Sequence, residues 1–157
     1  KGILDPGDTE REIHQNRCYV LDLGSGQTVT FPQEFQTPNG VVYDPVNQRL
    51  YLTEMKASRI YVADVIDGII APARLFIDLA KFEKGKPDGM AVDSAGRLYV
   101  ALYGQSDELL IISPTAEPLG VIATGTKTSN CTLTLDDRTL YLTAENQLKR
   151  IRLPWGD

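Results

Sequence analysis

Hydrophobic residues recur along this chain mainly at every second position. Short runs rich in Val, Ile, Leu and Tyr alternate with polar residues, and Gly, Pro, Asn and Asp separate the runs. This period of two is typical of strands with one buried face, and no segment has the spacing of an amphipathic helix. The pattern therefore predicts strands at 17–22, 28–31, 40–44, 49–53, 59–64, 73–78, 88–93, 97–102, 108–113, 119–123, 130–135, 139–144 and 147–153.

Two segments do not follow this alternation. Residues 1–16 show no periodicity and are predicted to form an irregular N-terminal arm. The charged segment 78–86 is predicted to be a surface loop that includes one helical turn at 79–84.

One pattern occurs three times along the chain. Each copy has a strand that begins at Asn39, Asp88 or Asn130, then a turn that contains Asp, and then a second strand that contains Leu-Tyr. Successive copies begin roughly 40 to 50 residues apart, which is the spacing of four-stranded β-propeller blades. The repeat therefore predicts an all-β propeller in which 40–44, 88–93 and 130–135 are adjacent innermost strands.

The number of strands is too small to close a ring. Residues 17–157 supply the outer strands of one blade (17–31), a blade at 39–78, a blade at 88–123 and an incomplete last blade at 130–153. Propellers contain about four to eight blades of four strands, so we expect about half of a ring. Because an open arc leaves strand edges and faces uncovered, we expect a complementary N-terminal half-propeller chain or a homo-oligomer to cover them.

Composition and charge exclude several kinds of partner. The chain has 16 Lys and Arg against 21 Asp and Glu, a net charge of −5, and so lacks the basic field that nucleic-acid binding needs. No apolar run approaches the roughly 20 residues that cross a bilayer. Lys1 opens the chain without an apolar leader, as in a processed or truncated protein.

The two cysteines, Cys18 and Cys131, are too few for a disulfide scaffold, so a reducing, cytoplasmic location is the simpler expectation. A Cys/His nucleophile pair would have to use His14, the only histidine, which lies in the irregular arm. The repeated tyrosines Tyr43, Tyr51, Tyr99 and Tyr141 are predicted to pack between blades, and Trp155 to pack on the arc or at a missing neighbour.

Asn39, Asp88 and Asn130 carry the candidate chemistry. They occupy the same place in three successive repeats, so we expect them to converge on the propeller axis as a set of oxygen donors, which suits a hard cation such as Ca²⁺ or Mg²⁺. The alternative is that Asn39-Gly40 and Asp88-Gly89 are only turn dipeptides that precede a strand. The residues by themselves leave these two interpretations about even.

The residues around these positions also resemble a known family. They are Thr37-Pro-Asn39-Gly40, then Lys86-Pro-Asp88-Gly89-Met90-Ala-Val-Asp93, then Thr128-Ser-Asn130-Cys131. They resemble the senescence marker protein/gluconolactonase/luciferin-regenerating enzyme family, from about residue 17 to the C-terminus, in the order of the later half of that family's chain. The resemblance implies a six-bladed propeller that binds a divalent metal on its axis and hydrolyses sugar lactones or related esters.

Carried over residue by residue, the resemblance makes Asn39 and Asp88 metal ligands, with Asp88 also the general base. It places Asn130 near the axis, beside the ligands or on the substrate side. The implied metal is Ca²⁺, with Zn²⁺, Mn²⁺ and Mg²⁺ left open. The family's metal-binding Glu has no match here, because Glu10, Glu12 and Glu54 lie in a different context.

Two other functions compete with the lactonase prediction. One is a non-enzymatic propeller that serves as a binding or scaffolding module, since a fold does not fix a function. The other is a related esterase or phosphotriesterase-like propeller with the same axial cation. The enzyme needs a carboxylate at Asp88, whereas a scaffold would tolerate Asn there, and we expect the isolated chain to be an incomplete enzyme.

Overall fold

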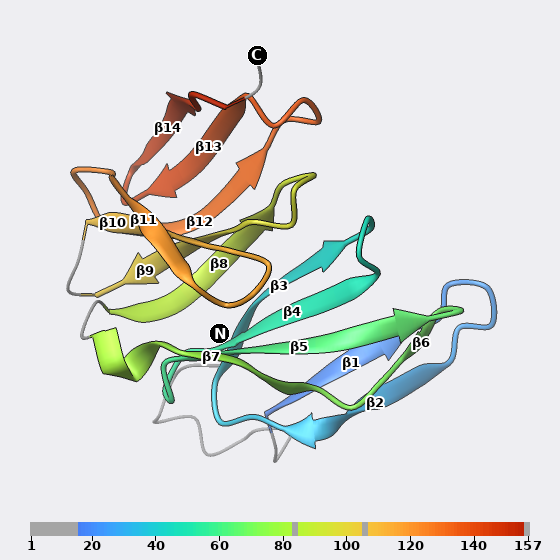
Figure 1. Ribbon diagram of the computed structural model, residues 1–157. Helices are drawn as coiled ribbons and strands as arrows, with labels where there is room; N and C mark the ends of the chain where they lie inside the picture. Colours follow the sequence, from blue (N-terminus) through green and yellow to red (C-terminus); the bar gives the residue numbers. More distant parts are fainter. Residues whose placement is uncertain (1–15, 83–84, 105–106, 156–157) are drawn as a thin grey trace.

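The computed structural model describes residues 16–82, 85–104 and 107–155, and they form an all-β structure (Figure 1). Alternation of buried and exposed residues gives short strands, and the one helical element within these described ranges is the 3-10 turn η1 (Leu79–Phe82). The strands are β1 (Arg17–Leu21), β2 (Thr28–Glu34), β3 (Pro38–Asp44), β4 (Arg49–Glu54), β5 (Arg59–Ile66), β6 (Ile69–Ile70), β7 (Arg74–Asp78), β8 (Lys86–Val92), β9 (Leu98–Tyr103), β10 (Glu108–Ile112), β11 (Pro118–Ala123), β12 (Thr128–Leu133), β13 (Thr139–Ala144) and β14 (Gln147–Arg152).

The strands form four antiparallel sheets that follow one another along the chain. β1 pairs with β2, β3 to β7 form the second sheet, β8 to β11 form the third, and β12 to β14 form the last. Within the three larger sheets the first strand lies at one end, and later strands are added outward. This is an open arc of propeller blades, about half of a ring, as the repeat predicted.

The three innermost strands are adjacent, which confirms the arrangement predicted from the repeat. β8 packs between β3 and β12, and Figure 1 shows these three strands side by side through the middle of the molecule. The start of each strand therefore lies beside the start of the next. The division of the chain into blades by residue limits stays a prediction.

The structure differs from the sequence prediction mainly at strand ends. The innermost strands β3, β8 and β12 each begin two residues earlier than expected. The short strand β6 was not expected; it pairs with the end of β5, while β7 pairs with the start of β5 along the same edge. The predicted irregular arm lies outside the described residues except for Asn16.

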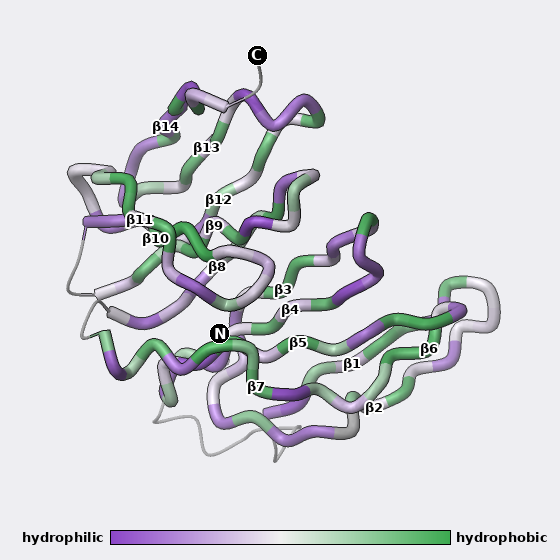
Figure 2. Tube along the Cα trace, in the orientation of Figure 1, coloured by the Kyte–Doolittle hydropathy of each residue, from purple (hydrophilic) through white to green (hydrophobic). Residues whose placement is uncertain are grey.

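Hydrophobic side chains fill the space between neighbouring sheets. Tyr51 is fully buried between the second and third sheets, and Tyr99 is fully buried between the third and the last. Figure 2 shows hydrophobic colour along many strands and hydrophilic colour at several turns. Tyr51 and Tyr99 are thus packing residues, as predicted, and Tyr141 is partly buried, but the prediction is wrong for Tyr43, which is 45% exposed.

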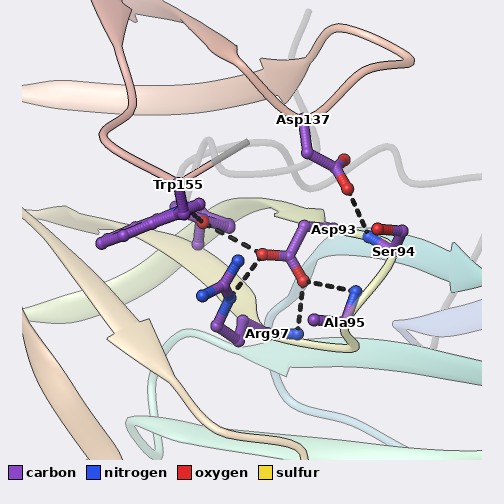
Figure 3. Close-up of polar contacts among 7 residues, drawn as sticks. Asp93, Ser94, Ala95, Arg97, Asp137 and Trp155 are labelled. Atoms are coloured by element: carbon purple, nitrogen blue, oxygen red, sulfur yellow. Dashed lines mark hydrogen bonds and ion pairs between the residues drawn. The ribbon is translucent and has the colours of Figure 1, made fainter. Parts of the chain in front are cut away.

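Buried carboxylates fix the turns that follow the innermost strands. The Asp93 Oδ1 atom accepts hydrogen bonds from the backbone amides of Ala95 (3.1 Å) and Arg97 (2.8 Å), and Oδ2 accepts from Arg97 Nε (2.6 Å) and from the Tyr99 hydroxyl (3.1 Å). Trp155 closes this cluster, because its Nε1 donates to the Tyr99 hydroxyl (2.6 Å) and its ring lies under the Arg97 guanidinium (Figure 3). The C-terminal segment is thereby attached to the preceding sheet.

Candidate functional site

Each innermost strand begins with the same irregularity. Two residues oppose one residue of the second strand: Asn39 and Gly40 oppose Thr53, and Asp88 and Gly89 oppose Ala101. Such a β-bulge re-aims side chains and is frequent beside active sites. The bulges therefore turn Asn39 and Asp88 away from the regular alternation of their strands.

The side chains of Asn39 and Asp88 meet at these bulges. Asp88 is partly buried, and burial raises the pKa of its carboxyl, while a hydrogen bond from Asn39 and one from the Gly89 amide partly offset that rise. An ionised carboxylate only accepts, so Nδ2 is the Asn39 atom that can donate to it; Nδ2 also donates to Met55 Sδ at 3.7 Å, and Oδ1 remains the acceptor atom of the amide. Asn39 and Asp88 thus lie close together, while their assignment as metal ligands and of Asp88 as the base stays a prediction.

Gly40 permits this close approach of β3 and β8. A Cβ atom added at Gly40 would lie 2.2 Å from the Asp88 carbonyl oxygen, a distance that backbone atoms cannot relieve. Gly89 has the same role toward β12, since a Cβ there would lie 2.1 Å from Asn130 Oδ1. The two glycines are needed for contact between sheets, in addition to any role in a turn.

Asn130 occupies a different place in the repeat from the one predicted. Counting from the paired strand, Asn130 matches Gly40 and Gly89, and Ser129 matches Asn39 and Asp88. Asn130 is exposed and packs on Gly89, and its Oδ1 accepts a hydrogen bond from the Cys131 amide (2.8 Å). It is therefore still beside Asp88, one residue out of phase.

Ser129 is the site residue that sequence reasoning missed. Ser129 lies near the start of β12, the third innermost strand, and its hydroxyl lies 3.0 Å from the Thr143 hydroxyl of β13. The repeated Asp was misleading here, because Thr134 and not Asp136 takes the place of Asp93: the Thr134 amide donates to the Thr139 carbonyl as the Asp93 amide donates to the Arg97 carbonyl. The Leu-Tyr pair does not decide the phase, because the interval from Asn39 to Leu50 counted back from Leu140 gives Ser129, whereas the interval from Asp88 to Leu98 gives Asn130.

The donors at Asn39 and Asp88 fit a hard cation in type but are few. Among the residues that the structure describes, the groups that shift the pKa of Asp88 are the Asn39 side chain and the Gly89 amide, and neither is a cation. Within residues 16–82, 85–104 and 107–155, no group of three or more His, Cys, Asp or Glu side chains could hold a metal ion. This part of the chain thus offers a cation one carboxylate and neutral oxygen atoms.

The other candidate residues have structural roles or lie outside the described chain. The buried Glu54 carboxylate accepts hydrogen bonds from the Gln36 and Thr37 amides (2.7 and 2.9 Å), so it orders the approach to β3. Burial raises the pKa of both thiols, that of Cys131 to about 12, which disfavours a nucleophilic thiolate. His14, Glu10 and Glu12 lie outside the described residues.

Comparison with known proteins gives this geometry a context. The model of the SMP-30/gluconolactonase/LRE-like region matches residues 5–146. Protein cueball of Drosophila virilis is 36% identical over 90 residues, which cover 57% of this chain and 13% of that protein. A gluconolactonase of Zymomonas mobilis is 28% identical over 161 residues, which cover 95% of this chain and 43% of the enzyme.

A solved structure shares the fold. The gluconolactonase of Xanthomonas campestris superposes with a TM-score of 0.79 at 25% identity, over 91% of this chain and 46% of that one. The chain therefore spans less than half the length of each of these relatives. In the part of the chain that the structure describes, no helix is long and apolar enough to cross a membrane.

Proposed function

The chain belongs to the SMP-30/gluconolactonase/LRE-like family, and from this membership we propose that it carries part of the active site of a sugar-lactone hydrolase. The observation that supports the proposal most is the partly buried Asp88 carboxylate, held by Asn39 at the junction of two innermost strands. Relatives described as gluconolactonases indicate the substrate class, a cyclic ester of a sugar acid.

In the proposed reaction Asp88 acts as the general base. Its carboxylate accepts a proton from a water molecule as the water oxygen attacks the lactone carbonyl. The tetrahedral oxyanion then collapses, the ring C–O bond breaks, and the ring oxygen takes up a proton to give the open hydroxy acid. Asn39 orients Asp88 through its amide hydrogen bond, which keeps one carboxylate oxygen directed at the axis.

We propose that the Asn39 Oδ1 atom and the Asp88 carboxylate would hold a divalent cation, with Ca²⁺ favoured because both donors are hard oxygen atoms. Such an ion would supply Lewis-acid polarisation of the lactone carbonyl. Two donors leave most of the six to eight Ca²⁺ positions to water or to other groups. Affinity for Ca²⁺ should therefore be modest in this chain alone.

Asn130 is proposed to contact the substrate. Its Oδ1 is engaged by the Cys131 amide, so Nδ2 is the atom that it offers to a hydroxyl or ring oxygen of the lactone. Its place on Gly89, next to Asp88, supports this role. Further substrate contacts would come from the complementary half of the ring, or from a second copy of this chain.

The first test substitutes Asp88. Asp88→Asn removes the base and the anionic ligand while keeping nearly the same shape, so calcium binding and lactone hydrolysis should both be lost, with the melting temperature little changed. Calorimetric titration with CaCl₂ measures binding on this chain. Hydrolysis of glucono-1,5-lactone by the intact protein, followed by acid release, measures activity.

A matched control is Asp67→Asn, which removes the same charge from an exposed turn residue with φ of 50°, a conformation that Asn tolerates. It should leave binding and hydrolysis unchanged. Full activity in Asp88→Asn would show that Asp88 is not the base and would favour the scaffold function. Faster hydrolysis of a p-nitrophenyl ester or a phosphotriester than of the lactone would favour the related esterase functions.

A further inference from the structure

We propose that Thr53 is the positioning residue of this site, because its hydroxyl joins the bulge that carries Asn39 to the bulge that carries Asp88. The assignment of those two residues to a ligand rests on the proposed function. The joining of the two bulges does not, and it can be measured separately.

The contacts of Thr53 reach two sheets. The side chain on β4 is fully buried, and its Oγ1 accepts a hydrogen bond from the Gly40 amide at 2.6 Å. The same hydroxyl donates toward the Asp88 carbonyl oxygen at 3.1 Å, with the Gly40 carbonyl as a more distant acceptor at 3.4 Å. One hydroxyl thus links the residue after Asn39 to the backbone of Asp88 itself.

The bulge explains why a hydroxyl is needed at this position. Asn39 and Gly40 both lie opposite Thr53 and lack a regular ladder partner, so without the Thr53 hydroxyl the Gly40 amide would be unpaired in a partly buried place. A buried amide without a partner is costly, and the Thr53 hydroxyl supplies the missing acceptor. The Thr53 hydroxyl can also donate one hydrogen bond, and the Asp88 carbonyl oxygen is the nearer of its two acceptors.

The other two sheets provide an internal comparison. The residue opposite the bulge is Ala101 in β9, which has no hydroxyl, and Thr143 in β13. Thr143 is exposed, and its hydroxyl contacts Ser129 (3.0 Å) and the Asn130 carbonyl (3.5 Å), both within its own sheet. Of these three positions, only Thr53 connects its sheet to the next one, and that connection is at Asp88.

The test compares Thr53→Ser with Thr53→Ala. Both variants lose the methyl group, but only serine keeps the hydroxyl. We expect Thr53→Ala to change the Asn39 side-chain amide signals in ¹⁵N NMR spectra and to speed hydrogen exchange of the Gly40 amide, while Thr53→Ser stays close to the parent. Thr143→Ala serves as the control and should leave both signals unchanged.

Calcium titration and lactone kinetics then relate this geometry to the proposed function. Misplacement of a catalytic group by about 1 Å can cost about 100-fold in rate, so kcat should fall by about 10- to 100-fold in Thr53→Ala with KM changing less. Thr53→Ser should restore most of it. If the parent neither binds Ca²⁺ nor hydrolyses a lactone, the proposed function fails, and the NMR comparison alone decides the role of Thr53.

Two outcomes would overturn the proposal. Unchanged Asn39 and Gly40 signals in Thr53→Ala would show that the hydroxyl does not hold the bulges in place. Failure of Thr53→Ala to fold while Thr53→Ser folds would assign the hydroxyl to folding and not to positioning.

Discussion

Carboxylates at the two ends of the innermost strands have different partners. Asp93, at the end of β8, is buried and is hydrogen-bonded by two backbone amides, a guanidinium and a phenol. Asp44, in the same place on β3, is bonded by the amides of Val46 and Asn47 and by the Asn47 side chain. Asp88, at the start of β8, has a side-chain amide and a backbone N–H as its partners among the described residues. Asp93 and Asp44 are satisfied by the turns that they hold, and this difference supports the proposal that Asp88 binds a ligand.

Tyr99 makes the turn cluster sensitive to alkaline pH. Burial, with the Asp93 charge beside it, raises the pKa of the Tyr99 phenol to about 12 from an ordinary value of 10.0. Between these two values the unfolded chain releases a proton that the folded chain keeps, so the free energy of unfolding falls as pH rises. The Tyr99 contribution is fully present below pH 10. A tyrosinate absorbance titration combined with urea unfolding at several pH values measures this.

Tyr99→Phe is the informative variant, because it removes the ionisable hydroxyl and keeps the aromatic ring. The tyrosine ionisation with a pKa of about 12 should be absent from the titration curve of the variant. The fall in the free energy of unfolding that this ionisation causes above pH 10 should be absent as well. Tyr141→Phe changes the matching position of the last sheet, where the ring is partly exposed, and should keep both features. Persistence of the late ionisation in Tyr99→Phe would contradict the assignment.

At the scale of strands and sheets, the repeat could be predicted well, because its signals are local. Alternating residues, turn residues and the recurrent Leu-Tyr pair fixed the order of strands and identified β3, β8 and β12 as neighbours. The phase of Asn130 was wrong because Thr134, and not Asp136, takes the place of Asp93 in the third copy, and the pairing with β13 shows which residue lies in the bulge. Thr53 was missed because its partners are backbone atoms of residues distant in the sequence.

The contact between β3 and β8 depends on Gly40. Gly40→Ala should destabilise the fold by about 1–3 kcal/mol, because the added methyl would overlap the Asp88 backbone and force the two strands apart. It should also weaken calcium binding through the displacement of Asp88. Thermal and urea unfolding measure the first effect, and calorimetry measures the second.

Gly120→Ala is a matched control on the exposed strand β11, where no atom lies within 4 Å of the added Cβ. Its stability should stay close to that of the parent. Equal stability of the two alanine variants would show that β3 and β8 can separate without cost.

For the whole molecule, the exposed faces of the arc differ from the faces between its sheets. Val41, Met90 and Cys131 occupy one register position in β3, β8 and β12. Met90 and Cys131 are covered by the preceding sheet and are 5% and 7% exposed, whereas Val41 is 60% exposed. The preceding sheet β1–β2 covers Leu52 through Phe31 and Phe35 but does not reach Val41. The face of β3 that carries Val41 and Tyr43 therefore has the character of an interface.

This exposed face predicts that the chain alone does not persist as a stable monomer. Association with a complementary half-propeller or with a second copy would bury Val41 and Tyr43 and pair open strand edges, so the purified chain should sediment as a dimer or larger species at micromolar concentration. Val41→Lys places a charge in that interface and should shift the distribution toward monomer, whereas Val121→Lys, on the 40% exposed Val121 of β11, should not. A monomer that unfolds in one cooperative thermal transition would show that the arc is self-sufficient, because an open β-sheet face of this kind would then carry no free-energy cost large enough to require a partner.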